Sequence, residues 1–200
     1  MGSALLLMVG CLMACSVAAF GQNYEYPPLS ATVRLRWFLK STLGPTAIAG
    51  GAVVAGWGTL FDHPKEYGTH WDGFGERYGL HVSQSATSNA IEAGIGALWD
   101  EDPRYFPDAG QPFRTRLGHV IKYTFFTTNR DGRTMPAYAH YAAISGSNFI
   151  SNEWRPPSQA NATDAGEWIA LGFAGRMASN ALHEFMPDLV RHFSHKQRDQ

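Results

Sequence analysis

The segment from Ser41 to Phe61, STLGPTAIAGGAVVAGWGTLF, runs for 21 residues without a charged side chain. Small residues recur at every fourth position within it, at Ala47, Gly51, Ala55 and Thr59. On a helix this spacing makes one face nearly flat, so that a second backbone can approach closely. The segment is long enough to cross a bilayer, although five glycines dilute its hydrophobicity. In a membrane the flat face would pack against another span, and in a soluble protein it would mark a buried helix crossing; the sequence leaves both interpretations open.

Helical patterns continue on both sides of this segment. Ser30 is a typical N-cap for a helix over 31–41, and Pro45 suits the first turn of the next helix. Apolar residues recur at intervals of three and four in several later segments, which predicts helices over 74–98, over 117–125, in the residues after Pro136 and over 164–185. The last two are again rich in Gly, Ala and Ser. The sequence therefore predicts an all-α fold of five or six helices packed through Gly/Ala/Ser-rich faces.

Two breaks punctuate the second half of the chain. Asn129–Arg130–Asp131–Gly132 is typical of a turn in which Gly132 adopts a positive φ. Pro187 is expected to kink or end the last helix, and the charged residues from Arg191 onward are expected to be solvated or frayed.

The amino-terminal residues resemble a targeting signal. An apolar stretch over 4–12 is followed by small residues and then by polar Gln22 and Asn23, which predicts a secretory signal peptide cleaved after Gly21. Leu12–Met13–Ala14–Cys15 also resembles a bacterial lipobox, in which Cys15 would be lipidated and would become the new amino terminus. Cleavage after Gly21 would leave a mature chain without a thiol, because both cysteines lie in the signal segment.

These features divide the chain into four parts. They are a signal peptide over 1–21, a Pro-containing extended arm over 22–29, a single helical domain over 30–190 and a charged tail over 191–200.

Composition and charge exclude some classes of function. Sixteen Lys and Arg face seventeen Asp and Glu, a formal net charge of −1, which leaves no positive surplus for binding nucleic acid. Charged residues make up 16 % of the chain and hydrophobic residues 44 %, which argues against disorder over most of its length.

Eight histidines do not fall into the spacing of a zinc site. The nearest approach is Asp188, His192 and His195, which share one face of a helix but lie in a charged tail. We therefore expect no metal and no cofactor.

One group of charged residues stands out as a candidate site. Asp100, Glu101 and Asp102 end the predicted helix over 74–98, and Arg104 and Tyr105 follow them. Carboxylates are unfavourable at a helix C-terminus, so we expect guanidinium partners from Arg104 or from Arg77, which is adjacent to Glu76. The cluster is interpreted as a structural ion-pair network, with acid/base chemistry as the alternative.

Four motifs carry a family resemblance over nearly the whole mature chain: Pro64–Lys65–Glu66–Tyr67–Gly68, Gly73–Phe74–Gly75–Glu76–Arg77–Tyr78–Gly79, Asp102–Pro103–Arg104–Tyr105–Phe106 and Asn152–Glu153–Trp154–Arg155–Pro156. With these motifs the chain resembles a family of exported proteins common in Acidobacteria that has no assigned reaction. Members of that family usually carry Trp at the position of Tyr67 and Tyr in place of Glu153–Trp154. The resemblance implies export and a helical architecture, and it carries over no catalytic residue.

The expected function is that of an exported cell-envelope protein, membrane-associated or partly embedded, with a structural or binding role and no catalysis. It would reside in the periplasm or at the outer membrane. Its expected partner is a membrane lipid or another envelope protein rather than nucleic acid, and an oligomer is compatible with the sequence. The alternative is a soluble periplasmic hydrolase using histidines and carboxylates near Glu76, Arg77, Asp102 and Arg104.

Overall fold

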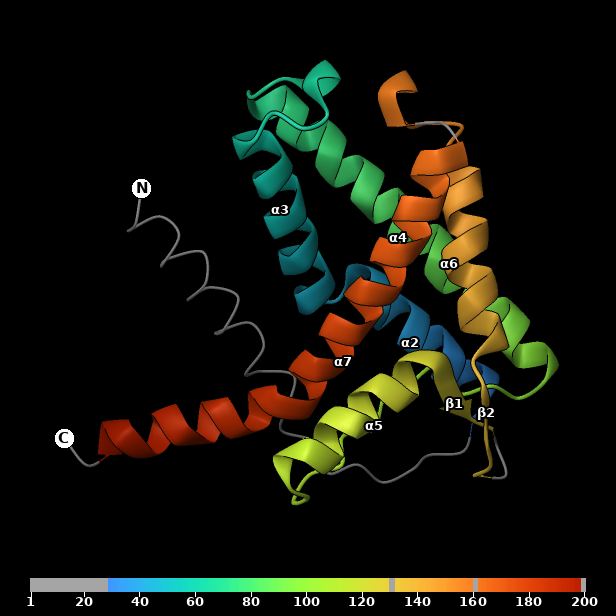
Figure 1. Ribbon diagram of the computed structural model, residues 1–200, viewed down its shortest axis with the longest axis vertical. Helices are drawn as coiled ribbons and strands as arrows, with labels where there is room; N and C mark the ends of the chain where they lie inside the picture. Colours follow the sequence, from blue (N-terminus) through green and yellow to red (C-terminus); the bar gives the residue numbers. More distant parts are fainter. Residues whose placement is uncertain (1–28, 130–131, 160–161, 199–200) are drawn as a thin grey trace.

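The computed structural model describes residues 29–129, 132–159 and 162–198. This part of the chain is predominantly α-helical, as the sequence predicts (Figure 1). Its helices and strands are α2 (Ala31–Leu43), α3 (Pro45–Leu60), η1 (Lys65–Tyr67), α4 (Trp71–Leu98), α5 (Phe113–Phe125), β1 (Phe126–Thr128), β2 (Thr134–Pro136), α6 (Tyr138–Ser151), η2 (Pro157–Gln159) and α7 (Ala162–Arg198). The predicted signal peptide, Cys15 and all of the arm except Leu29 lie outside the described residues.

The helix starts follow from local chemistry. Ser30 caps α2, its hydroxyl accepting a hydrogen bond from the Val33 amide at 3.3 Å. Gly44, with extended backbone, ends α2 and precedes Pro45, the first residue of α3. Both features were predicted, and together they divide the apolar stretch into two consecutive helices.

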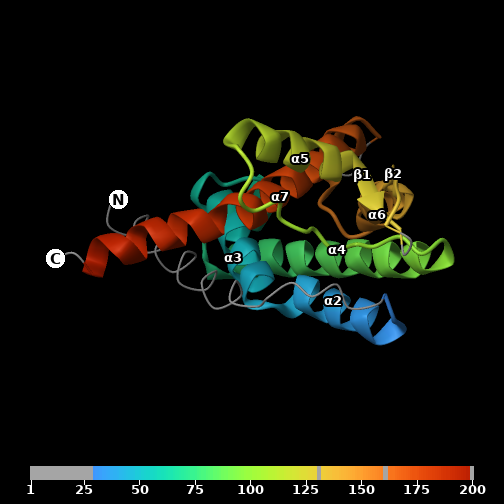
Figure 2. The same cartoon turned by 90° about the horizontal axis from the view of Figure 1, so that it is seen from below.

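The long helix α4 is the centre of the fold. Figure 2 shows α2 on one side of α4 and α5 and α7 on the opposite side, and α3 packs on the N-terminal half of α4. Helix α6 lies along the C-terminal half of α4 and also contacts α7 (Figure 1). Helices α2, α3 and α6 pack on α4, whereas α5 packs on α7.

Small residues make the helix contacts, as predicted. Gly51 and Ala55 of α3 are buried against α4, where a Cβ at Gly51 would lie 2.9 Å from the His81 ring and 3.1 Å from that of Tyr78. Thr59, one turn further on, hydrogen-bonds the Ala55 carbonyl at 2.8 Å. Helix α6 has a similar buried face at every fourth position, formed by Ala139, Ala143, Ser147 and Ser151. Close backbone approach thus determines how the layers stack.

A short antiparallel hairpin was not predicted. Strands β1 and β2 pair Phe126 with Pro136 and Thr128 with Thr134, around the predicted turn. Gly132 adopts φ 74°, the left-handed conformation expected there. Strands of three residues are too short to show an alternating pattern, which explains why only the turn was predicted.

Helix α7 is longer than expected. It continues through Pro187 to Arg198, so its backbone is helical where a solvated or frayed tail was expected. Its direction changes near the C-terminal end (Figure 1). Proline removes one backbone hydrogen bond and pushes away the preceding turn, which bends a helix that is otherwise stable.

The interior contains few large apolar side chains and many polar ones. Among the described residues, the buried hydrophobic side chains are mostly alanine, with Leu29, Val120, Ile144 and Met186 as the larger ones. Seventeen polar or charged residues are buried alongside them. One such group joins Gln84, Asn148 and Arg155, whose side chains hydrogen-bond one another at 2.7–3.1 Å. Hydrogen bonds and close helix contacts, rather than large apolar side chains, therefore form most of this core.

Candidate functional site

Arg77 fixes the loop between α3 and α4. Its guanidinium donates hydrogen bonds to the backbone carbonyls of His63, Pro64, Gly68 and Gly73, at 2.7–3.1 Å. The side chain is buried, and these carbonyls solvate its charge in place of water. Arg77 is therefore a structural cation that closes the loop onto the first turns of α4.

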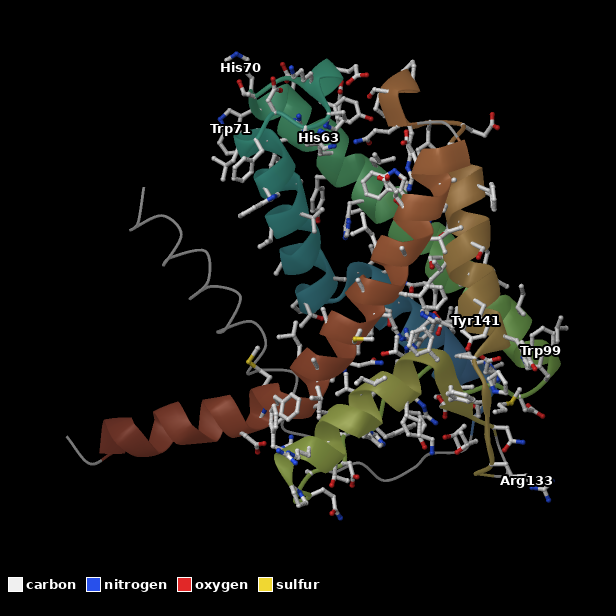
Figure 3. The ribbon with its side chains drawn as sticks, viewed as in Figure 1. His63, His70, Trp71, Trp99, Arg133 and Tyr141 are labelled. Atoms are coloured by element: carbon white, nitrogen blue, oxygen red, sulfur yellow. The ribbon has the colours of Figure 1, made fainter. Side chains whose placement is uncertain are left out.

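The expected pairing of Arg77 with Asp100–Asp102 is wrong. Arg77 lies in the second turn of α4, whereas these carboxylates follow its last turn, roughly 35 Å away along a helix that rises 1.5 Å per residue. Figure 3 shows the separation, with His70 and Trp71 at one end of α4 and Trp99 at the other. The adjacent Glu76 is exposed. Glu76 and Arg77 therefore form no common site with Asp102 and Arg104.

The three consecutive carboxylates have separate tasks. Asp100 adopts φ 58° and turns the chain away from α4. Glu101 is buried and accepts hydrogen bonds from the Trp99 indole at 2.7 Å and from the Ala139 amide at 3.0 Å, so it caps α6. Asp102 binds the Arg104 guanidinium at 2.6–3.2 Å. The predicted ion pair with Arg104 is confirmed.

Tyr105, which follows this segment, hydrogen-bonds Glu184, a fully buried carboxylate on α7. Glu184 accepts hydrogen bonds from the Tyr105 hydroxyl at 2.7 Å, from Arg116 Nε at 2.7 Å and from the Asp108 amide at 3.1 Å. His119 Nδ1 lies 3.0 Å from the same hydroxyl oxygen. Burial favours the protonated carboxyl, but these donors outweigh it and hold the pKa of Glu184 below its ordinary value. Burial, with the hydrogen bond to Glu184, raises the pKa of Tyr105. Tyr105 therefore stays protonated at neutral pH and acts as a donor.

The weak metal candidate on α7 has a different role. Asp188 lies one turn beyond Glu184 and accepts a hydrogen bond from Arg116. The side chains of His192 and His195 lie outside the described residues. Among the residues that the structure describes, no three His, Cys, Asp or Glu side chains are grouped as metal ligands. What is seen of Asp188 is an ion pair between α5 and α7.

The sequence did not predict the pocket that is the best candidate for a functional site. A small pocket lies where α4, α5, α6, α7 and β1 meet, and its lining includes an ionisable side chain from each of three helices: Glu92, His140 and Arg176. Glu92 Oε2 lies 3.2 Å from His140 Nδ1, and Glu92 Oε1 accepts a hydrogen bond from Arg176 Nη2 at 3.2 Å. Burial raises the pKa of Glu92, but Arg176 and His140 outweigh this and lower it overall, so the carboxylate is ionised.

Two polar atoms in this pocket have no partner. His140 Nε2 and Arg176 Nε are buried and make no hydrogen bond to any described residue. A single signal in the sequence could have indicated His140: it is the one histidine between Pro136 and Glu153, a segment without Asp, Glu, Lys or Arg. Three other histidines lie away from this pocket. His63 and His70 lie near the N-terminal end of α4 (Figure 3), and His81 packs against Gly51.

The outer surface presents the large apolar side chains that the interior lacks. On α2, Leu35, Leu39 and Leu43 are exposed at intervals of four residues. On α3 and just after it, the exposed apolar side chains are Ile48, Val54, Trp57, Leu60 and Phe61. We call these eight residues the apolar layer. A second exposed stripe runs along α5 through Phe113, Leu117, Ile121 and Phe125.

Comparison with known proteins gives no relative: no family model, no curated protein and no solved structure matches the chain. The resemblance to the exported Acidobacteria family therefore stays a prediction.

Proposed function

We propose that the protein is an exported cell-envelope protein that attaches to a membrane through the apolar layer of α2 and α3, with a structural or binding role. In this proposal the helices on the other side of α4 carry the polar interior and face away from the lipid. The partner of the apolar layer is the lipid bilayer itself.

The distribution of polarity carries the proposal. Exposed apolar residues are normal on soluble proteins when they are scattered, whereas buried charges and continuous apolar surface are informative. Here buried charged residues such as Arg34, Arg77 and Glu92 coexist with eight large apolar side chains exposed on α2, on α3 and just after it. In water that layer would cost free energy at roughly 25 cal/mol per Å² of exposed apolar surface. Contact with lipid removes this cost.

Helices α2 and α3 have the composition of a membrane-contacting unit. By length and composition, the helical stretch Ala31–Leu60 could cross a membrane, and 17 % of its apolar window is buried. A core helix of a soluble protein would be mostly buried. Arg36 and Lys40 are exposed on α2, beside its leucines, whereas α3 carries no charge. This arrangement suits an α2 at the headgroup level, where basic side chains meet anionic lipid, and an α3 that reaches deeper.

Liposome flotation of the purified protein tests this proposal. The double substitution Ile48→Asp and Val54→Asp places two charges on α3, at side chains that are 49 % and 55 % exposed. Because neither side chain is buried, the fold should persist while the bound fraction falls by tenfold or more. The matched control is Leu171→Asp with Leu182→Asp on α7, where the side chains are 57 % and 54 % exposed.

We expect the α7 variant to float with the liposomes like the wild-type protein. Equal flotation of the wild-type protein and the α3 variant would contradict attachment through the apolar layer. Loss of flotation in the α7 variant alone would place the membrane contact on the opposite side of α4.

A further inference from the structure

Helix α5 carries its large apolar side chains on its exposed face. The face that packs on the protein contains Arg116 and Thr124, both buried. The α5 stripe consists of Phe113, Leu117, Ile121 and Phe125, which recur at every fourth position and are 38–65 % exposed. Rings of Phe173 and Phe185 on α7 contact the two ends of this stripe. Side chains exposed to this degree stand out from the surface rather than line a groove, so the stripe suits a flat partner better than a peptide.

The exposed charges on α5 are all basic. Arg114 and Lys122 are exposed, and the segment 109–129 contains no Asp or Glu. The carboxylate of Asp188 on α7 is already paired with Arg116, on the buried side of α5. An amphipathic helix with basic side chains beside an apolar stripe is typical of helices that lie in the headgroup region of an anionic bilayer.

The sign of these charges argues against a second copy of the chain as the partner. Two α5 helices packed together would bring Arg114 and Lys122 of both copies close to one another. The apolar layer carries the exposed cations Arg36 and Lys40, so α5 would also meet like charge on the apolar layer of another copy. An anionic bilayer complements both surfaces, because its hydrocarbon accepts apolar side chains and its phosphates accept cations.

We propose that α5 is a second membrane-binding surface, and that one molecule bridges two bilayers with anionic headgroups. Bridging rests on the proposed function, because the apolar layer holds the first bilayer. Helix α5 lies on the side of α4 opposite α2 (Figure 2). The surface of a single bilayer therefore cannot contact both helices, and the bilayer that α5 binds is a different one.

The contact made by one α5 helix is weak. The helix has 13 residues and is about 20 Å long, whereas the apolar layer draws on two helices. A molecule that has lost the apolar layer should therefore bind liposomes poorly. Many molecules attached to one vesicle present many copies of α5, and this multivalency allows weak contacts to hold a second vesicle.

Clustering of vesicles by the purified protein tests the proposal. Vesicles of phosphatidylcholine mixed with phosphatidylglycerol are followed by dynamic light scattering, and flotation of the same samples reports attachment. We expect the wild-type protein to float with the vesicles and to cluster them. Leu117→Asp with Ile121→Asp places two charges on exposed positions of the stripe. This variant should float like the wild-type protein, while clustering falls about tenfold or more.

Two further variants separate the stripe from general effects. Arg114→Glu with Lys122→Glu reverses both exposed charges of α5 and leaves the apolar side chains in place, so it should also float without clustering. It keeps the test decisive if the aspartate variant does not fold. The matched control, Leu171→Asp with Leu182→Asp on α7, should cluster vesicles like the wild-type protein.

Three results would overturn the proposal. Clustering by either α5 variant equal to that of the wild-type protein would show that the stripe holds no bilayer. Flotation of the wild-type protein without clustering is expected of a chain embedded in one bilayer, or of an α5 that binds another protein. Failure of the proposed function is distinguishable, because the α3 variant Ile48→Asp with Val54→Asp would then float like the wild-type protein.

Discussion

Arg77 is buried, and its closest contacts are carbonyl oxygens rather than a carboxylate. Five of its hydrogen bonds reach the Thr59 hydroxyl and the carbonyls of His63, Pro64, Gly68 and Gly73, while Asp62 is 3.8 Å away. A buried cation that makes five hydrogen bonds is costly to replace, because its acceptors would lose their partner. The loop between α3 and α4 therefore depends on this one side chain.

We expect Arg77→Met to destabilise the protein by about 3 kcal/mol, since several buried carbonyls lose a charged donor. Thermal unfolding followed by circular dichroism measures the loss, and limited proteolysis should cut the loop between Leu60 and Trp71. The neighbouring Glu76→Gln is the control, because Glu76 is exposed and its replacement should change stability by less than about 0.5 kcal/mol. Equal melting of both variants would contradict this role for Arg77.

The lowered pKa of Glu184 makes the stability of the folded protein depend on pH. The pKa of Glu184 in the folded state is lowered, because hydrogen bonds from Arg116, Tyr105 and Asp108 outweigh the effect of burial. A lowered folded-state pKa stabilises the protein fully above the unfolded-state pKa of about 4.3. The stabilisation is lost as the pH falls through the folded-state pKa. We therefore expect stability to decline below about pH 4.3, with Glu92 acting in the same direction.

Glu184→Gln separates the contribution of this charge from general acid effects. The variant should be less stable at pH 7 by about 3 kcal/mol, because Arg116 would lose its buried partner. It should also lose less stability than the wild-type protein between pH 5 and pH 3. Asp188→Asn is the matched control on the same guanidinium, with a half-exposed carboxylate and a smaller expected effect. Parallel stability profiles of wild type and Glu184→Gln would count against the assignment.

At the scale of the element, two adjacent glycines of α3 test the close approach of α3 to α4. Gly51→Ala would place a Cβ 2.9 Å from the His81 ring, whereas nothing lies within 4 Å of a Cβ at Gly50. Both substitutions gain roughly 0.5–1 kcal/mol of helix stability. We expect Gly50→Ala to raise the melting temperature and Gly51→Ala to lower it, because overpacking costs about 1–3 kcal/mol. The same sign in both variants would mean that the flat face does not determine this contact.

The parts of the fold that were predictable are those that depend on neighbouring residues in the sequence. The N-cap at Ser30, the start at Pro45, the small-residue face of α3 and the turn at Gly132 each follow from neighbouring residues, and each is confirmed. The strands around that turn and the helical backbone of α7 as far as Arg198 were missed, although a kink at Pro187 was one of the two expected outcomes. Both depend on tertiary contacts or on a balance between bending and breaking a helix, and periodicity reports neither.

The candidate site was predictable only where its partners are close in sequence. The pair of Asp102 and Arg104 spans two residues and was expected, whereas the contact of Glu92 with His140 spans 48. A charged residue on the buried face of a helix resembles a surface residue until its partner is known. Arg77 was given the wrong partner although the predicted helix over 74–98 already separates it from Asp100–Asp102, because a helix rises 1.5 Å per residue.

On the scale of the whole molecule, charges and hydrogen bonds lie inside and large apolar side chains lie outside. Two exposed apolar surfaces are the apolar layer of α2 and α3 and the stripe on α5, and α5 lies on the side of α4 opposite α2 (Figure 2). We propose the apolar layer as the first lipid contact, because its exposed apolar side chains come from two consecutive helices and α3 carries no charge. Such attachment should persist without any lipid modification of the chain.

Fractionation of cells that express the full chain with Cys15→Ser tests this central claim most directly. The substitution abolishes lipidation at position 15, so only the protein surface can hold the chain on a membrane. After washes with high salt and then with alkaline carbonate, we expect the protein to stay in the membrane fraction, with an intact mass that starts near Gln22. Its release into the soluble fraction with the same mass would contradict the account.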